Sequence, residues 1–545
     1  MKTQYRLLAT FIAASLMTAC NDSDNNDNST PPAPVNTPPV VADVSAQTTS
    51  ASAVMINVLS SASDADGDTL TIASAEASNG SATIKEGQIE YDPKGYVGAD
   101  RIRFAISDGS DETSATVTVT VTQAEVTLSY VGSSACQGCH ASEYETHQLH
   151  GHNFKISKVE DGVMPSFPYT DVSGGMQLIR HHDADGNEIA TMNTLGAPDS
   201  YDDVTYTTGG YWKKIRWFDK NGHIVTGDAV QYNLYGTPSD QQMSGYHASD
   251  VDMVYNCGNC HNTGWRPYTT ETYEHRQDDL PGFGGDFAYA GVQCEACHGA
   301  GSEHIAGPSS ANITKVAEPR STELLQSASM GYGEPMHCAE CHTRDGNRAG
   351  GDAGNDYING YKTAFPDGEE FGGRIAAKGG LTRHHQGHDE FMGIDPETGE
   401  TTNPHYNAGL SCASCHNPHK STVNKDSADG KHTNAVKSCN ECHTEQGFND
   451  GMVSLHASFE CTTCHMPEVV KNATSRVTRA GVTFGDEMTH VMNIDLFSDK
   501  SQLTDDGKFM NPMLKDAWAC GECHAPGSKL QSLSDNYGGK IHKAK

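Results

Sequence analysis

The chain has 545 residues, of which only 36% are hydrophobic, and it carries a formal net charge of −33. The length predicts several domains. The charge argues against nucleic acid or an anionic lipid surface as a partner, although a solvated acidic surface would carry the same charge. The low apolar content predicts that cofactors, rather than a conventional hydrophobic core, fill much of the interior.

Residues 1–20 have the form of an export signal. Lys2 and Arg6 give a positive start, and the apolar run 7–17 is too short to cross a membrane. The segment ends Leu16-Met-Thr-Ala-Cys20, which resembles the lipobox of bacterial lipoproteins. The resemblance implies that Cys20 is lipidated; ordinary cleavage beside a stray cysteine is the alternative. We expect an exported protein, lipid-anchored to the periplasmic or cell-surface face of the outer membrane, with no other contact with the membrane.

The next two segments differ sharply in composition. Residues 21–40 are polar and proline-rich, which predicts a disordered tether. Over residues 41–123 apolar residues alternate with Thr and Ser, as in 101–106 and 115–121, and turn residues separate the runs. This pattern predicts an all-β sandwich.

The turns of this β module carry several aspartates. Asp64-Ala-Asp66-Gly-Asp68 and Ser107-Asp108-Gly109 resemble the cadherin-like or Ig-like modules of bacterial surface proteins. The resemblance implies a Ca²⁺ site, since Ca²⁺ takes roughly six to eight oxygen ligands from flexible loops. Turn-forming aspartates without metal are the alternative. The candidate ligands are Asp64, Asp66, Asp68, Asp100 and Asp108.

The rest of the chain is dominated by a pentapeptide, Cys-x-x-Cys-His, that occurs eight times. This is the attachment sequence for c-type haem, in which both thiols bond to the porphyrin and the His binds the iron. The composition predicts roughly 0.03 copies by chance. The copies are Cys136-Gln-Gly-Cys139-His140, Cys257-Gly-Asn-Cys260-His261, Cys294-Glu-Ala-Cys297-His298, Cys338-Ala-Glu-Cys341-His342, Cys412-Ala-Ser-Cys415-His416, Cys439-Asn-Glu-Cys442-His443, Cys461-Thr-Thr-Cys464-His465 and Cys520-Gly-Glu-Cys523-His524.

Zinc sites and disulfides are the other uses of paired cysteines, but neither requires a His after every second Cys. The motifs use all but one of the 17 cysteines, and the remaining one is Cys20. From residue 136 onward there are roughly 51 residues per motif. We therefore expect a loop-rich, mainly α octahaem domain over residues 129–545, in which eight haem c groups lie against one another.

Residues 151–256 contain no haem motif. Tyr211–Phe218, the turn Asp219-Lys-Asn-Gly222 and residues 223–226 predict a hairpin within a β-rich insert. This stretch, together with NCGNCHNTGW, GVQCEACHGAGSEH and GLSCASCHNPH, resembles blocks in multihaem cytochromes of metal- and sulfur-metabolising bacteria. The resemblance covers most of residues 129–495 and implies an octahaem c-type cytochrome.

Each iron also needs a ligand on its other face. Of 27 histidines, 19 lie outside the motifs, which favours bis-histidine ligation over methionine. For any one of them a surface or hydrogen-bonding role is the alternative. Spacing and the resemblance select His150, His304, His384, His385, His405, His419, His432, His456 and His490, with His388 as a substitute for the pair at 384 and 385.

Two functions fit these features. In the first, the protein is a non-enzymatic relay that passes electrons to other cytochromes or to extracellular acceptors. In the second, it is an octahaem oxidoreductase that reduces nitrogen or sulfur oxyanions or oxidises hydroxylamine. An enzyme needs an open haem position beside acid–base and cationic groups, and the insert 151–256 would hold such a pocket. We favour the relay, since no motif shows the Lys that often marks the catalytic haem in octahaem nitrite reductases.

Overall fold

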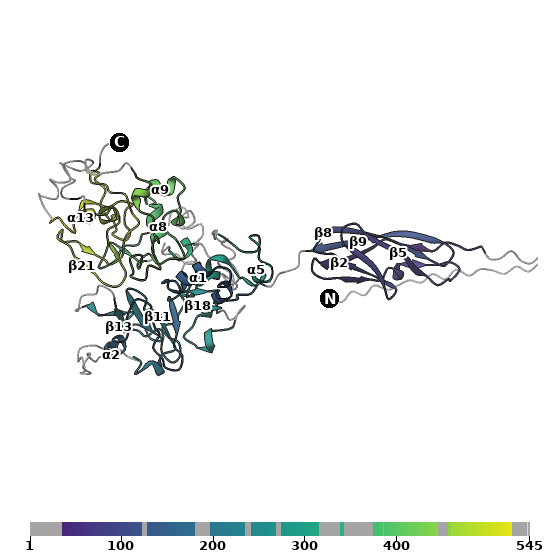
Figure 1. Cartoon of the computed structure of the whole chain (residues 1–545), viewed down its shortest axis with the longest axis horizontal. Coiled ribbons are helices and arrows are strands. Elements are labelled where there is room, and N and C mark those ends of the chain that lie inside the picture. The colour runs from purple at the N-terminus through teal and green to yellow at the C-terminus, as the bar shows by residue number, and fades with distance from the viewer. Residues whose placement is uncertain are drawn as a thin grey trace, which may run out of the picture. The chain divides into compact units, whose positions relative to one another are not determined.

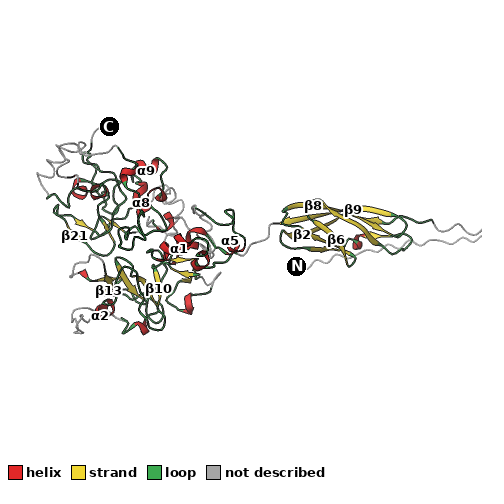
Figure 2. Ribbon diagram, in the orientation of Figure 1, coloured by secondary structure: helices red, strands yellow, loops and turns green. Residues whose placement is uncertain are grey.

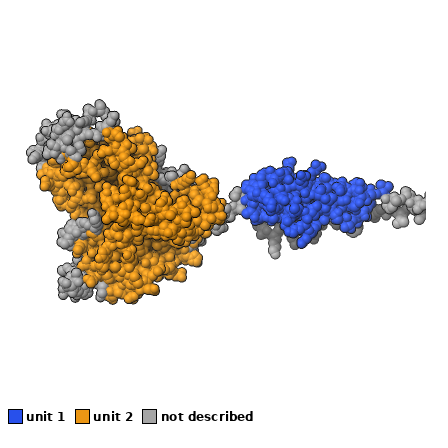
Figure 3. All heavy atoms as spheres, viewed as in Figure 1, with its two compact units in different colours: residues 1–127 blue, residues 128–545 orange. Residues whose placement is uncertain are grey.

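The computed structural model describes residues 35–122, 128–179, 197–234, 241–268, 274–315, 338–342, 374–384, 386–444, 456, 458–525 and 542. The predicted signal segment, with Cys20, and the predicted tether up to residue 34 lie outside this description. The chain divides into two compact units, residues 1–127 and 128–545, coloured separately in Figure 3.

The first unit is built from two β-sheets, as Figures 1 and 2 show. One sheet has the order β2-β9-β8-β5, with β2 parallel to β9 and the other neighbours antiparallel. The second has the antiparallel order β3-β7-β6, and β1 pairs with β4. The strands are β1 (Val40–Val41), β2 (Val44–Thr49), β3 (Val54–Ile56), β4 (Ala62–Ser63), β5 (Thr71–Ala77), β6 (Ser81–Lys85), β7 (Gln88–Asp92), β8 (Gly98–Ser107) and β9 (Glu112–Thr122).

Alternation along the strands explains the core of this unit. In β9, Val117, Val119 and Val121 are buried, whereas the threonines between them are exposed. The valines pack with Ile102 and Phe104 of β8. Successive side chains of a strand point to opposite sheet faces, so this pattern commits one face to the core. The predicted β module is confirmed.

The second unit begins with the β-rich insert, which forms a five-stranded antiparallel sheet in the order β10-β11-β12-β13-β14. The predicted hairpin is β12 and β13, with Lys214 opposite Asn233 and a bridge between Phe218 and Ile224. The strands are β10 (Ile156–Lys158), β11 (Tyr206–Gly209), β12 (Lys214–Trp217), β13 (Gly227–Asn233) and β14 (Met243–Tyr246).

The insert has a conventional core, contrary to the expectation of an interior filled mainly by cofactors. Ile179, Ile215, Trp217 and Val230 are fully buried and pack together. A second cluster, around Phe283, lies on the same sheet. The insert thus supplies a rigid wall for the rest of the unit.

Elsewhere the second unit is loop-rich, with short helices and two-stranded ribbons. The sheet of the insert lies at one end of the unit and α8, α9 and α13 lie at the other (Figure 1). The ribbons pair β15 (Asn262–Thr263) with β18 (Tyr289–Ala290), β16 (Arg266–Pro267) with β17 (Gly285–Asp286), β19 (Thr382–Arg383) with β20 (Val470–Lys471), and β21 (Arg476–Val477) with β22 (Thr483–Phe484). The helices are α1 (Ala141–Gln148), α2 (Gly175–Ile179), α3 (Gly258–His261), α4 (Cys294–His298), α5 (Ser302–Ala306), α7 (Cys338–Cys341), α8 (Gly387–Met392), α9 (Pro404–Asn407), α10 (Cys412–Cys415), α12 (Thr462–His465) and α13 (Asp516–Ala519).

None of the helices in the described residues has the length and apolar character needed to cross a bilayer.

Candidate haem-binding site

Each pentapeptide folds as about one turn of helix. In seven copies the backbone N–H of the motif His donates to the carbonyl oxygen of the first Cys, at distances of 2.8 Å to 3.2 Å. In the remaining copy the same five residues form α4. Residues three apart on a helical turn share a face. The Cys-x-x-Cys spacing therefore presents both thiols together, as attachment to one porphyrin requires.

Seven of the eight motifs line one continuous cavity of about 3080 Å³. Divided among seven motifs, this is about 440 Å³ each, which lies within the range of roughly 300–1,000 Å³ for a cofactor pocket. The motif at Cys520 is not among the lining residues. The shape of the second unit thus fits several large cofactors in mutual contact.

Five histidines that the sequence selected each lie opposite a motif histidine. Their ring centroids are about as far apart as two imidazoles on either side of one ion. The pairs are His140 with His304 at 6.5 Å, His298 with His419 at 6.1 Å, His443 with His405 at 5.7 Å, His416 with His490 at 6.0 Å and His524 with His456 at 6.4 Å.

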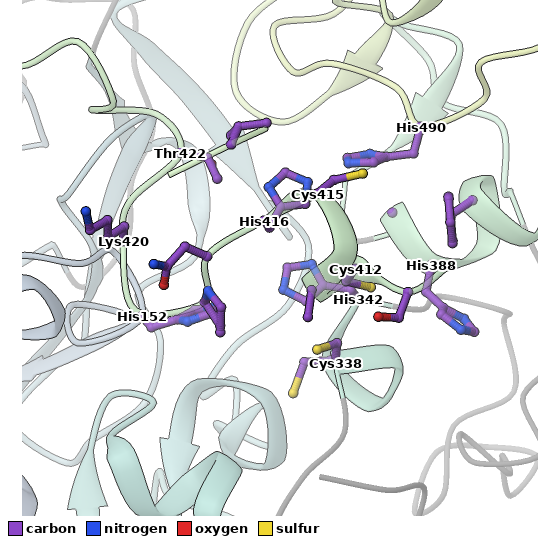
Figure 4. A pocket seen from close by; sticks show the side chains of 18 of the residues that line it. His152, Cys338, His342, His388, Cys412, Cys415, His416, Lys420, Thr422 and His490 are labelled. Atoms are coloured by element: carbon purple, nitrogen blue, oxygen red, sulfur yellow. The ribbon is translucent and has the colours of Figure 1, made fainter. Parts of the chain in front are cut away.

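Two further pairs use histidines that sequence reasoning missed. His152 lies 6.2 Å from His342, and His542 lies 5.8 Å from His465, between ring centroids. Figure 4 shows His152 beside His342, and His490 across from His416, around Cys338 and Cys412. His152 was one of three histidines close together in sequence, and nothing around His542 marks it as a ligand.

The other selected histidines occupy different places. His150 lies beside His147 and His152 rather than beside a motif histidine. His432 is buried, accepts a hydrogen bond from the backbone N–H of Ser421 and packs edge-on against Tyr169. The remaining three are as follows: Nδ1 of His384 is 3.2 Å from the carbonyl oxygen of Lys471, the backbone N–H of His388 donates to the carbonyl of His342, and His385 lies outside the described residues.

The facing pairs suit iron ligation in their geometry. Metal–imidazole bonds of about 2 Å on both sides of one ion place the ligating nitrogens roughly 4 Å apart. The Nε2 atoms are 3.4 Å apart in the His405–His443 pair and 3.5 Å apart in the His465–His542 pair, so a small outward movement would admit an iron.

The protonation state of these rings also fits. Burial lowers the pKa of His342 and of His490 to about 4, and it holds the pKa of His152 well below its usual range. These imidazoles are therefore neutral at neutral pH, which is the form that binds a metal.

Contacts between cysteine side chains show which motifs are neighbours. Side-chain hydrogen bonds join Cys136 to Cys294, Cys260 to Cys341, Cys338 to Cys412, and Cys439 to Cys461. Weaker electrostatic contacts join Cys297 to Cys338, Cys415 to Cys439, and Cys464 to Cys523. Numbered in chain order, the motifs therefore follow one another as first, third, fourth, fifth, sixth, seventh and eighth, and the second motif joins at the fourth.

The second motif lies beside a group of cationic side chains. Arg216 interacts electrostatically with Cys257 and lies 3.6 Å from the ring centroid of Tyr246. Lys155 interacts with Cys260 and with the buried carboxyl of Glu487. Burial lowers the pKa values of both Lys155 and Arg216, since neither charge is fully solvated. An anion placed here would offset that desolvation cost.

Three of the five predicted calcium ligands come together. Carboxylate oxygens of Asp64, Asp66 and Asp68 lie within 4.8 Å of one another. Asp108 instead accepts hydrogen bonds from the side chain of Asn36 and from nearby backbone N–H groups.

Asp100 is fully buried, and protein donors occupy its carboxylate. It accepts hydrogen bonds from the Tyr91 hydroxyl and from the backbone N–H groups of Asn79, Gly80 and Arg101. These bonds link β8 to the turn before β6, which is a structural role. They leave Asp100 poorly disposed to bind an ion with the other three aspartates.

Two family models match parts of the chain. Residues 36–122 match the bacterial Ig domain, and residues 218–299, which include the second and third motifs, match the family of cytochrome c554 and c-prime. Over 195 residues the chain is 25% identical to the dissimilatory sulfite reductase MccA of Wolinella succinogenes. That match covers 32% of this chain and 22% of the reductase, so the chain spans under a quarter of the length of this relative.

Solved structures give weaker similarities. The outer cell wall cytochrome OcwA aligns over 75% of this chain and 86% of its own, with a TM-score of 0.37 and 16% identity. The endo-fucoidan hydrolase MfFcnA4 aligns over 16% of this chain and 14% of its own, with a TM-score of 0.13 and 18% identity.

Proposed function

We propose that this chain, a multihaem c-type cytochrome with a bacterial Ig domain, relays electrons through eight covalently attached haems. The observation that carries the proposal is that seven motif histidines each face a second histidine within the described residues. Two histidines on one iron make a six-coordinate, low-spin centre that changes its redox state without binding a substrate.

The residues of the chain have three tasks in such a relay. The paired thiols hold each haem, the facing imidazoles fix its orientation and tune its potential, and the surrounding protein limits its exposure to water. Neighbouring thiols at Cys136 and Cys294, and again at Cys338 and Cys412, would keep successive haems in close approach. The order of the motifs describes a line of seven haems with the second as a branch at the fourth.

The location and partners of the relay follow from the N-terminal segment. We propose export, lipidation at Cys20 and attachment to the outer membrane, with an Ig domain between the anchor and the haem-bearing unit. Other cytochromes or extracellular acceptors would then exchange electrons with the exposed haems. Covalent c-type haem is itself attached outside the bacterial cytoplasm, which supports export.

A second candidate, an oxyanion reductase, is favoured by the cations beside the second motif. Arg216 and Lys155, with Tyr246 next to them, would suit a nitrogen or sulfur oxyanion at that haem. The partial similarity to a sulfite reductase points the same way. A haem propionate would satisfy the same cations, so the cluster alone does not decide between the two functions.

Protein-film voltammetry of the intact holoprotein separates the candidates. The relay predicts reversible waves over a broad range of potential that do not change when nitrite, sulfite, tetrathionate or hydroxylamine is added. A catalytic current with any of these compounds would overturn the relay in favour of the enzyme. A count of eight haems per chain by the pyridine haemochrome method is required by both.

A further inference from the structure

Glu295 occupies an unusual position, because it is one of the two variable residues inside the third motif and yet is only 2% exposed. Variable positions of a haem motif carry no ligand, so nothing in haem attachment requires a carboxylate there. A buried carboxylate is costly unless donors satisfy it. Its partners therefore indicate its role.

Backbone N–H groups from two other segments satisfy this carboxylate. Oε1 accepts from Val131 at 2.9 Å and from Gly301 at 2.7 Å, and Oε2 accepts from Gly132 at 2.8 Å. Such charge-assisted bonds are stronger than neutral ones. One side chain thus ties the third motif to two stretches of main chain far from it in sequence.

Those two stretches carry the two sides of the first haem site. Gly132 directly precedes the turn Ser133–Cys136, which brings in the first cysteine of the first motif. Gly301 is the N-cap residue of α5, which carries His304. His304 faces His140, the motif histidine of the first site.

Further contacts align the same three segments. The Ser133 hydroxyl donates to the side chain of Gln293 and accepts from the backbone N–H of Cys294. Ser129 and Ser302 exchange two hydrogen bonds. These contacts fix the register of the segments, but only the Glu295 carboxylate bonds to both at once.

We infer that Glu295 is a positioning residue that holds His304 on the iron of the first haem while keeping the first and third haems at a fixed separation. The inference rests on the proposed bis-histidine ligation. Gln would keep the size of Glu295 but would replace one acceptor oxygen by a donor group and remove the charge. The N–H groups of the two segments would then lack an acceptor, and α5 would be free to withdraw His304.

A second buried carboxylate has the same relation to a different site. Glu390 in α8 is 2% exposed, and its Oε2 accepts from the backbone N–H of His490 at 2.7 Å and from the Thr489 hydroxyl at 2.9 Å. His490 faces His416 of the fifth motif. The same device therefore occurs twice, at sites far apart in sequence.

The test compares E295Q with H304A and with E303Q in the full-length holoprotein. Glu303 is exposed and lies beside His304, so E303Q is the matched control. EPR and near-infrared magnetic circular dichroism count high-spin haem, and the pyridine haemochrome method counts total haem. We expect H304A and E295Q each to gain a high-spin signal of about one haem per chain at unchanged haem content, added imidazole to restore the low-spin signal, and E303Q to resemble the wild type.

The possible failures are distinguishable. If H304A gains no high-spin haem, the proposed ligation itself is wrong. If H304A gains it but E295Q does not, the role of Glu295 is overturned. Loss of haem from several sites in E295Q would also overturn it, because Glu295 would then support folding in general. G301A is a milder second variant: the added Cβ would stand 3.1 Å from Oε1 of Glu295, and a fully low-spin G301A would count against the inference.

Discussion

His152 and His342 face each other with ring centroids 6.2 Å apart, although one follows the first motif and the other ends the fourth. This pairing predicts that H152A converts the haem of the Cys338 motif from low-spin to high-spin, because the ring opposite His342 is removed. EPR of the oxidised protein should show the gain of about one high-spin haem.

The matched control is H150A, since His150 lies only 4.4 Å from His152 between ring centroids. We expect H150A to keep the low-spin spectrum of the wild type. The opposite pattern, a change in H150A and none in H152A, would transfer the ligand role to His150.

Lipidation predicts a simple change of location for C20A. An acyl chain contributes roughly 0.8 kcal/mol of membrane affinity for each buried methylene group, and the acyl chains provide the only anchor that we propose. We expect C20A to move from the membrane fraction to the soluble exported fraction and to lose labelling by radioactive palmitate. If C20A remained in the membrane fraction, the anchor would have to lie elsewhere.

Asp100 should stabilise the Ig domain in a pH-dependent manner. Burial opposes its ionisation, but hydrogen bonds from Gly80, Tyr91 and Arg101 prevail and lower its pKa below the ordinary value of 3.8. Because the folded pKa is depressed, the stabilisation is complete above the unfolded value and is lost as pH falls through the folded pKa.

D100N should therefore lower the free energy of unfolding by about 3 kcal/mol at neutral pH, and the difference from the wild type should shrink below about pH 4. Urea denaturation followed by circular dichroism at several pH values measures both effects. An equal loss at pH 3 and at pH 7 would refute the role of the charge.

Trp217 should anchor the insert, because it is fully buried in the core of the five-stranded sheet and its indole N–H donates to the Tyr201 hydroxyl. W217A should lower the free energy of unfolding of this region by about 4 kcal/mol. Limited proteolysis would show earlier cleavage within residues 151–256. V251A is a suitable control, since Val251 is 80% exposed.

The features predicted most fully from sequence are those set by local spacing. The Cys-x-x-Cys-His copies fold as helical turns because residues three apart share a face. The Val and Thr alternation in residues 115–121 produced a strand with one buried face. The aspartates at 64, 66 and 68 meet because they share one turn. None of these inferences needs knowledge of distant chain.

The features that escaped prediction depend on tertiary contacts. His147, His150 and His152 are all close to one turn of chain, and only the path that brings the fourth motif beside them selects His152. His542 reaches His465 from near the C-terminus. Asp100 looked like a calcium ligand until the turn before β6 was seen to donate to it. Sequence spacing carries no record of such approaches.

The most direct test of the account is a count of low-spin and high-spin haems in the oxidised, full-length protein by EPR and magnetic circular dichroism. The account predicts that at least seven of the haems are low-spin and bis-histidine ligated, one for each facing pair in the described residues. The spin state of the haem at the second motif then separates the relay, which requires it to be low-spin, from the reductase. Two or more high-spin haems would contradict the proposed ligation and, with it, the relay.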